Sequence, residues 1–205
     1  MENFFTLTML FSIGTFAITS AITPGPNNIM LLSSGLTFGF KRTIPHIGGI
    51  IVGFPFMLLL IGLGMGIIFE KYPIVLSVLK IVGILYLVWM AYKIATNTST
   101  YDVKEDGDSR PFTFLQAAIF QWVNPKAWIM GVTAISIFIT AKEDNYGQIL
   151  ILTFIFLLSA IVSCNTWALG GVFLKRFIKN TKSIRIFNIF MALLLVASVL
   201  PIILE

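Results

Sequence analysis

The stretch 20–32, SAITPGPNNIMLL, places two prolines, a glycine and two asparagines inside an otherwise apolar run. Pro24 and Pro26 have no backbone N–H to donate within a helix, and the glycine between them adds conformational freedom. A continuous helix over residues 4–40 would also be about 55 Å long at about 1.5 Å per residue, which exceeds one upright membrane span. The sequence therefore predicts a helix that breaks near residues 23–28.

The composition indicates an integral membrane protein. Of the 205 residues, 57% are hydrophobic and 11% are charged, whereas charged residues make up about 25% of an ordinary soluble domain. The excess of basic residues does not indicate a nucleic-acid partner, because basic residues in membrane proteins usually report topology. The single cysteine, Cys164, excludes an internal dithiol relay. We expect the lipid bilayer as the surroundings and no nucleic acid as a partner.

Six apolar segments are long enough to cross a membrane as helices, which takes roughly 20 residues each. They cover approximately residues 4–24, 47–69, 73–95, 112–139, 149–173 and 184–204. None shows the period-two alternation of a barrel strand, and a helix satisfies its own backbone hydrogen bonds in lipid. The predicted fold is therefore an all-α membrane protein with six transmembrane helices, in a single transporter domain over residues 1–205.

Basic residues in the connections predict the orientation of these helices. The connections after the first, third and fifth segments contain ten of them: Lys41, Arg42, Lys93, Lys104, Arg110, Lys175, Arg176, Lys179, Lys182 and Arg185. The opposite side has only Lys71 and Lys142. Because basic residues accumulate on the cytoplasmic side, both termini are predicted to face outward, on the periplasmic side of a bacterial inner membrane.

A second interruption of the same kind lies in the fourth segment, where FQWVNPKAWIM contains Asn124, Pro125 and Lys126. In both interruptions a residue that often caps a helix precedes a proline: Thr23 in the first and Asn124 in the second. Proline is favoured at the first position of a helix because its missing N–H costs nothing there. A new helix is therefore expected to begin at each interruption.

The two interruptions fall in the first segment of each half of the chain. With three segments per half, the repeats 1–96 and 111–205 would be inverted relative to each other across a cytoplasmic loop at 97–110. Interrupted helices in corresponding positions are the pattern of a transporter binding site, because fresh helix starts present unpaired N–H groups to an anion such as a carboxylate. The predicted substrate-binding residues are Thr23, Pro24, Gly25, Pro26, Asn27, Asn124, Pro125 and Lys126. The other interpretation is that both interruptions are proline kinks that serve helix packing.

Lys126 is the strongest single candidate, because a lysine within a span is costly and usually faces a cavity or a partner. We expect its ammonium to anchor a substrate carboxylate; the alternative is a side chain that extends to the membrane interface. A second group is predicted to support binding or to couple transport to protons: His46, Asn28, Asn165 and Lys80. For His46 and Lys80 an interfacial position is the competing interpretation, and for the two asparagines it is interhelical packing.

The acidic residues argue against two other classes of function. All nine lie in predicted loops or at the chain ends, whereas an exporter of metals or organic cations would need carboxylates within the membrane. Neither a metal site nor a cofactor is therefore expected. An intramembrane hydrolase would need a serine–histidine or carboxylate pair, and the one histidine has no acidic residue nearby. We predict a transporter and not an enzyme, with a non-transporting membrane scaffold as the alternative.

The motifs TPGP at 23–26 and NPK at 124–126 resemble those of the lysine exporter and homoserine-resistance family of bacterial amino-acid efflux proteins. Three stretches resemble its cysteine and O-acetylserine exporter branch: ITPGPNNIMLLSSGLTFGFKRTIPHIGGIIVGF at 22–54, GILYLVWMAYKIAT at 83–96 and GVTAISIFI at 131–139. One departure is that NPK follows the general family pattern, whereas this branch replaces the proline.

The resemblance implies six helices in an inverted three-plus-three arrangement and efflux of a small amino acid in exchange for protons. For this chain we expect cysteine, O-acetylserine or a related small neutral amino acid, exported by proton-coupled antiport with alternating access. Homoserine, threonine and lysine are the alternative substrates. Small-residue spacings such as Gly49-x-x-x-Gly53 allow close helix approach, either within one chain or at the seam of a homodimer.

Overall fold

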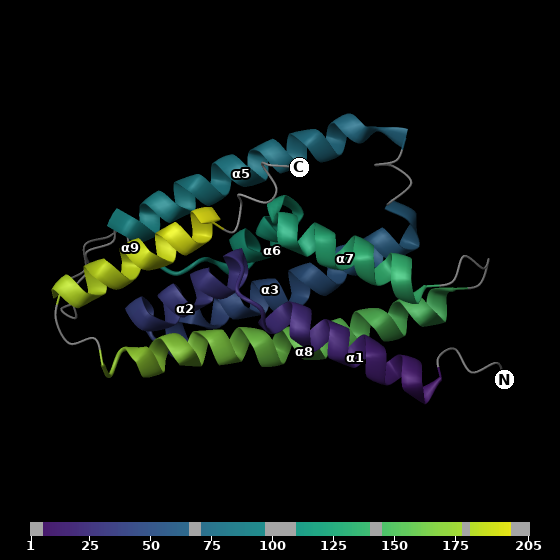
Figure 1. Cartoon of the computed structure of the whole chain (residues 1–205), viewed down its shortest axis with the longest axis horizontal. Helices are drawn as coiled ribbons and strands as arrows, with labels where there is room; N and C mark the ends of the chain where they lie inside the picture. Colours follow the sequence, from purple (N-terminus) through teal and green to yellow (C-terminus); the bar gives the residue numbers. More distant parts are fainter. Residues whose placement is uncertain (1–5, 66–70, 97–109, 140–144, 178–180, 198–205) are drawn as a thin grey trace.

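The computed structural model of the protein describes residues 6–65, 71–96, 110–139, 145–177 and 181–197. These residues form eight α-helices and one short π-helical turn, and the described ranges contain no strand (Figure 1). The elements are α1 (Leu7–Ile22), α2 (Pro26–Phe38), α3 (Phe40–Leu60), η1 (Ile61–Met65), α5 (Pro73–Thr96), α6 (Phe114–Val123), α7 (Pro125–Phe138), α8 (Tyr146–Leu174) and α9 (Thr181–Ala197). The prediction of an all-α fold is confirmed for this part of the chain.

Two of the described helices are long and apolar enough to cross a membrane on their own, Phe40–Gly64 and Tyr146–Leu174. A third span results if α1 and α2, which are bent by 56° at their junction, are counted together. Shorter apolar helices make up the rest: Ile81–Thr96, Phe114–Val123, Pro125–Phe138 and Arg185–Ala197. These helices agree with the predicted membrane class, and the arrangement of six spans stays a prediction.

The second predicted segment begins earlier than expected. α3 starts at Phe40 and not near residue 47, because Gly39, with φ 78°, turns the chain within one residue and lets the next helix begin at once. The basic residues expected in a loop here therefore form the first turn of α3. Two other expectations fall partly outside the described residues: the end of the last segment, at 198–204, and most of the loop at 97–110.

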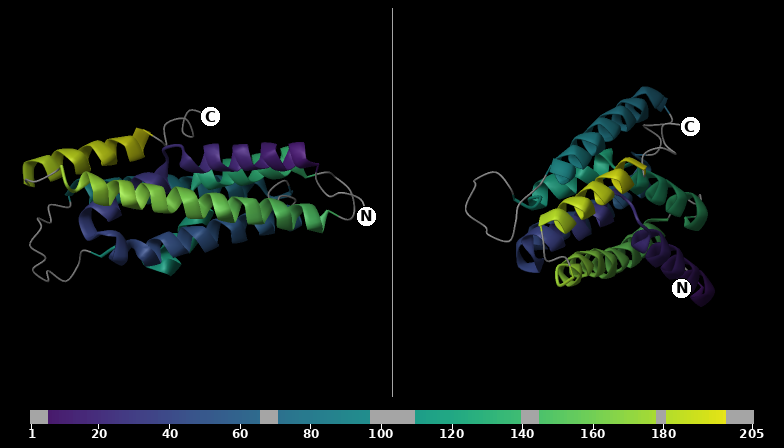
Figure 2. Two further views of the ribbon diagram at one scale, coloured as in Figure 1. Left: turned by 90° about the horizontal axis from the view of Figure 1, so that it is seen from below. Right: turned by 60° about the vertical axis from the view of Figure 1, so that its left-hand side comes forward.

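The helices pack in pairs that relate the two halves of the chain. α2 packs against α8 and α6 packs against α3, while α3 also contacts α8 and α5 lies beside α9 (Figure 2). If the elements of the two halves are matched in chain order, α1 corresponds to α6, α2 to α7, α3 to α8 and α5 to α9. The pairs α3 with α8 and α5 with α9 then map onto themselves, and the contacts of the broken helix α1–α2 with α8 correspond to those of the broken helix α6–α7 with α3. The piece that makes the larger contact differs, since it is α2 in the first half and α6 in the second.

Glycines allow the closest of these contacts. A Cβ atom at Gly35 of α2 would collide with the backbone of α8, and one at Gly171 of α8 would collide with the backbone of α2. At Gly49 and Gly53 of α3, an added Cβ would collide with α6. The spacing Gly49-x-x-x-Gly53 therefore serves close helix approach within one chain, which is the first of the two uses predicted for it.

Large apolar side chains cover the outside of the molecule as well as its interior. Leu7 and Phe11 on α1 are 84% and 77% exposed, and similar exposed residues occur along α5 and α8. So many exposed apolar side chains are unfavourable in water but suit lipid. α2 is the exception, because the bundle surrounds it and most of its residues are buried.

Candidate functional site

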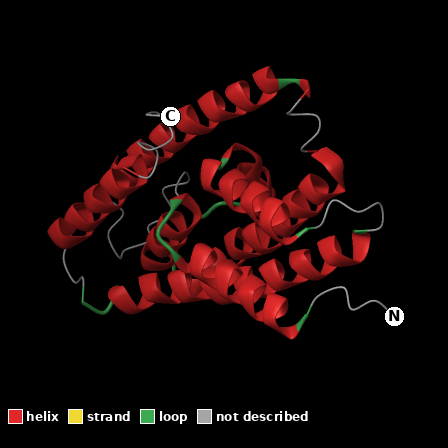
Figure 3. Ribbon diagram, turned by 45° about the vertical axis from the view of Figure 1, so that its right-hand side comes forward, coloured by secondary structure: helices red, strands yellow, loops and turns green. Residues whose placement is uncertain are grey.

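The first break separates α1 from α2 within three residues (Figure 3). α1 ends at Ile22 with Thr23 as its C-cap, and α2 begins at Pro26 with Gly25 as its N-cap. The prediction that Thr23 caps the start of the new helix is therefore wrong. Pro26, and not Pro24, occupies the first position of the new helix. The break lies between the two prolines, because Pro24 cannot continue α1 and Pro26 is favoured as the first residue of α2.

Side chains replace the hydrogen bonds that the two prolines remove from α1. In a continuous helix, residues with an N–H at positions 24 and 26 would donate to the carbonyl oxygens of Ser20 and Ile22. Thr23 Oγ1 donates to the Ser20 oxygen at 2.8 Å, and the Trp167 Nε1 of α8 donates to the Ile22 oxygen at 3.1 Å. Each carbonyl left open by a proline thus has a side-chain donor, as burial in an apolar bundle requires.

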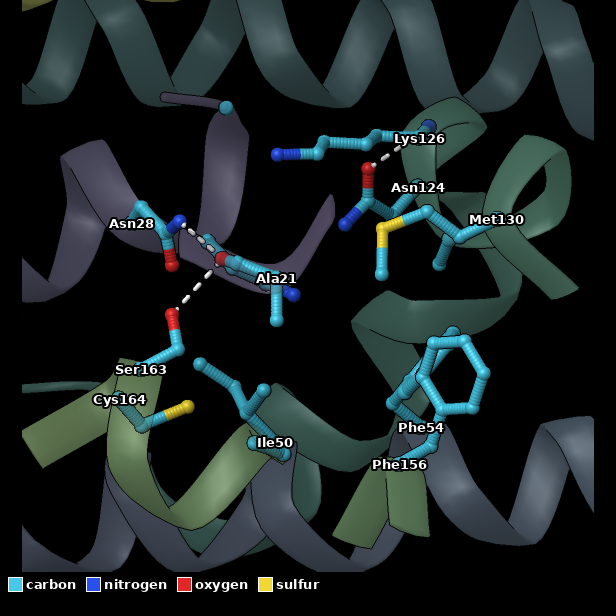
Figure 4. A pocket seen from close by; sticks show the side chains of 14 residues that line it. Ala21, Asn28, Ile50, Phe54, Asn124, Lys126, Met130, Phe156, Ser163 and Cys164 are labelled. Atoms are coloured by element: carbon cyan, nitrogen blue, oxygen red, sulfur yellow. Dashed lines mark hydrogen bonds between the residues drawn. The ribbon is translucent and has the colours of Figure 1, made fainter. Parts of the chain in front are cut away.

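The neighbouring carbonyls at the end of α1 are also occupied. The Ala21 oxygen accepts from Asn28 Nδ2 and from Ser163 Oγ, both at 2.7 Å (Figure 4). Asn28 Nδ2 also donates to the Thr23 oxygen at 2.8 Å. Asn28, predicted as a supporting residue, therefore joins the two sides of the break, and Ser163 connects the break to α8.

Lys126 reaches across from the second break to the first. Its ammonium donates to the Thr23 carbonyl oxygen at 2.6 Å, to Thr23 Oγ1 at 2.8 Å and to the Pro24 carbonyl oxygen at 3.4 Å. Gly25 leaves room for this side chain, because a Cβ atom there would lie 2.6 Å from Lys126 Cδ. Gly25 has extended backbone angles, φ −177° and ψ 177°, that any residue can adopt, so the need for glycine is space and not conformational freedom.

The second break follows the prediction more closely. Asn124 is the N-cap of α7 and Pro125 occupies its first position. Asn124 Oδ1 accepts from the backbone N–H of Lys126 at 3.2 Å, and the Asn124 carbonyl oxygen accepts from the N–H groups of Ala127 and Trp128. The start of α7 is thus internally capped. α2 differs, because its N-cap is a glycine and its start has no side-chain cap.

An amide pair connects the two breaks. Asn27 Nδ2 donates to Gln121 Oε1 at 2.8 Å, and Gln121 Nε2 donates back to Asn27 Oδ1 at 3.2 Å. Gln121 is fully buried, and its Nε2 also donates to the Ala117 carbonyl oxygen within α6. The sequence analysis did not select Gln121. The sequence does contain a signal that could have identified it, because an amide side chain lies inside an apolar segment, three residues before the NPK motif.

A cavity of about 50 Å³ lies between the two breaks and α3 and α8 (Figure 4). Its lining is polar on the side of the breaks and apolar opposite: Ala21, Gly25, Asn27, Asn28, Ile50, Phe54, Asn124, Lys126, Ala127, Met130, Phe156, Ala160, Ser163 and Cys164. The structure therefore brings together five of the predicted binding or supporting residues, namely Gly25, Asn27, Asn28, Asn124 and Lys126, while the prolines shape the backbone beside them.

Three predicted supporting residues do not line this cavity. His46 of α3 is 2% exposed, packs edge-on against Phe112 at 5.1 Å between ring centroids, and has no hydrogen-bond partner for either ring nitrogen among the described residues. His46 is therefore buried against neighbouring helices and not part of the cavity lining. Asn165 donates to the Ile161 carbonyl oxygen of its own helix. For Lys80 the structure gives only its place on α5.

Comparisons with known proteins identify the family of the chain. Residues 18–201 match the LysE type translocator family. The chain is 34% identical over 195 residues to a cysteine/O-acetylserine efflux protein of Escherichia coli O157:H7, a match that covers 93% of this chain and 95% of the relative. Proteins with the same description in Escherichia coli strain K12 and Shigella sonnei strain Ss046 are 33% identical over the same shares. No solved structure matches the chain.

The family match covers most of the chain, including both breaks and all residues of the cavity. Its members are translocators and not enzymes, which agrees with the predicted class. The chain belongs to the LysE type translocator family of membrane transport proteins.

Proposed function

We propose that this protein exports a small neutral amino acid, such as cysteine or O-acetylserine, across a bacterial inner membrane by proton-coupled antiport. The efflux proteins that it resembles are named for these two substrates. Homoserine, threonine and lysine are the alternative substrates. The alternative function from a different class is a membrane scaffold that transports nothing.

The observation that carries the proposal is the pair of opposite helix ends at the cavity. α1 ends there with its carbonyl oxygens and α2 begins there without a side-chain cap, and Gly25 at the junction lines the cavity. A helix end carries partial negative charge at its carbonyls and partial positive charge at its N–H groups. An amino acid carries an ammonium and a carboxylate side by side, so one broken helix offers complementary charge to both.

The size of the cavity favours small substrates. A volume of about 50 Å³ holds about four water molecules, which occupy about 120 Å³ of liquid at about 30 Å³ each. This space is on the scale of a short amino acid, and the site must widen more for lysine than for cysteine. The apolar wall formed by Ile50, Phe54, Met130 and Phe156 suits a short, weakly polar side chain.

Alternating access would move one three-helix unit against the other around this cavity. The correspondence between the contacts of the broken helix α1–α2 with α8 and those of the broken helix α6–α7 with α3 supports two inverted repeats, 1–96 and 111–205, in six spans. In that arrangement both termini face the periplasm, and Lys126, His46 or the substrate's own amino group would couple the movement to protons. The residues that line the cavity come from both halves of the chain, as a site between two moving units requires.

The test is uptake into inside-out membrane vesicles that contain the full-length protein. Labelled cysteine, O-acetylserine, homoserine, threonine and lysine are each supplied with and without an imposed proton gradient. We expect gradient-dependent accumulation of the small neutral amino acids, little accumulation of lysine, and loss of accumulation in Lys126→Met. Gly14→Ala is the matched control, because nothing lies within 4 Å of a Cβ atom at Gly14.

Three results would each contradict part of the proposal. Correctly inserted protein that accumulates none of the five amino acids would remove the assigned substrate class and favour the scaffold. Accumulation that is unchanged by the proton gradient would keep the exporter but reject antiport with protons. If Lys126→Met transports like the wild type, the cavity between the breaks is not the substrate site.

A further inference from the structure

Three oxygen atoms at the end of α1 form a cradle for one ammonium group. They are the carbonyl oxygens of Thr23 and Pro24 and the Oγ1 of Thr23, at 2.6, 3.4 and 2.8 Å from the Lys126 Nζ. A primary ammonium has three hydrogens to donate, so Lys126 matches this oxygen cradle donor for acceptor. Thr23 is exposed, so the cradle is not closed off by packing.

The occupant of the oxygen cradle contradicts the simplest view of Lys126. A lysine that anchors a substrate carboxylate would present its ammonium to the cavity or to the start of α2. Here the ammonium passes Gly25 at the cavity wall together with its aliphatic stem, and its hydrogen bonds go to oxygen atoms at the end of α1. The same oxygen atoms are the natural receptor for the ammonium of an amino acid bound at this break.

We propose that Lys126 is a tethered substitute for the substrate's α-ammonium group. In the empty transporter it fills the oxygen cradle, which keeps the carbonyls at the end of α1 hydrogen-bonded. When an amino acid binds, its ammonium displaces the Lys126 ammonium, which is then free to pair with the substrate's carboxylate. This inference rests on the proposed function. In this displacement model Lys126 competes with the substrate's ammonium for the oxygen cradle, whereas in the anchor model Lys126 only binds the substrate's carboxylate.

The local structure permits this displacement at little cost. Lys126 holds α7 to its cap through its backbone N–H, which donates to Asn124 Oδ1, and that bond does not involve the side chain. The side chain has a flexible four-carbon stem and passes a residue without a Cβ atom. The ammonium can therefore leave the oxygen cradle while both helix starts keep their hydrogen bonds.

The displacement model and the anchor model predict opposite responses to removal of the lysine. The probes are cysteine, cysteamine, which lacks the carboxylate, and mercaptopropionic acid, which lacks the ammonium. Binding is measured by calorimetry with full-length protein in lipid nanodiscs under reducing conditions. In wild type, we expect cysteamine to bind at least about tenfold more weakly than cysteine, because it must displace Lys126 without gaining the bond to a carboxylate.

In Lys126→Met the oxygen cradle is vacant, so cysteamine should bind about tenfold more tightly than it binds wild type, and mercaptopropionic acid should not. If cysteine binding falls in this variant and cysteamine binding does not rise, Lys126 is only an anchor and the proposal is overturned. Lys93→Met is the matched control, because Lys93 is exposed on the last turn of α5.

A second variant keeps the lysine and blocks its path. In Gly25→Ala the new Cβ atom would lie 2.6 Å from Lys126 Cδ and 3.1 Å from its Nζ, which displaces the side chain from the oxygen cradle. We expect the same gain in cysteamine affinity as in Lys126→Met, while Gly14→Ala should behave as wild type. This variant gives an answer even if removal of Lys126 prevents folding, and an unchanged cysteamine affinity in it would overturn the proposal.

The results separate this inference from the proposed function. Wild-type export of cysteine without any gain in cysteamine binding in either variant would keep the exporter and overturn the substitute role of Lys126. A gain in cysteamine binding in both variants, without export of any amino acid by wild type, would support the oxygen cradle and overturn the exporter.

Discussion

The amide pair between Asn27 and Gln121 should stabilise the contact between the two breaks by a measurable amount. The two side chains exchange hydrogen bonds of 2.8 and 3.2 Å, and Gln121 is fully buried. Side-chain hydrogen bonds between membrane helices contribute about 0.6 kcal/mol each on average and about 1.7 kcal/mol at most. Two such bonds therefore predict a coupling energy of about 1–3 kcal/mol.

A double-mutant cycle measures this coupling. The free energy of unfolding in detergent is determined for wild type, Asn27→Ala, Gln121→Ala and the double variant. Each single variant should lose about 1–3 kcal/mol, because it leaves the other amide without its partner. The double variant should lose less than the sum of the two, since both partners are then absent and no amide is left unpaired.

The control is a second cycle between Gln121 and Asn165. The Asn165 side chain donates to the Ile161 carbonyl oxygen of its own helix, α8. In that cycle the double variant should lose as much free energy of unfolding as the two single variants together. If the losses for Asn27 and Gln121 also add to within about 0.5 kcal/mol, the amide pair does not connect the breaks energetically, and the description of the site as one unit held across the two halves is wrong.

Further predictions concern the helix cap, the close helix contact and the buried histidine. Asn124→Ala removes the side-chain cap of α7 and should lower the free energy of unfolding by about 1 kcal/mol; an unchanged value would mean that water replaces the cap. Gly171→Ala forces α8 away from the backbone of α2 and should lose about 1–3 kcal/mol, whereas Gly14→Ala, with open space around it, should lose nothing measurable in the same unfolding assay. His46→Leu removes two buried nitrogens that have no partners in the described structure and should raise the free energy of unfolding by about 1 kcal/mol. Retained gradient-driven export in that variant would reject the predicted coupling role of His46, and lost export despite higher stability would support it.

The breaks were predictable because proline acts locally. The motifs around Pro24 and Pro125 predict interrupted helices in any tertiary structure, because a proline never has a backbone N–H. The cap at Asn124 followed from the same local pattern and is confirmed. The cap expected at Thr23 was wrong, because two prolines spaced two residues apart allow the new helix to begin at either one, and only the packed structure selects the second.

The sequence by itself determined that this chain forms apolar helices, that two of them break, and that a lysine stands at one break. Only the tertiary structure decided which groups compensate for the breaks. Lys126 meets Thr23 over a separation of 103 residues, and Trp167 meets Ile22 over 145. No local pattern encodes such pairings. A carbonyl at a break takes whichever donor the packing of distant helices brings within reach, and here that packing brought the Lys126 ammonium to Thr23 and the Trp167 indole to Ile22.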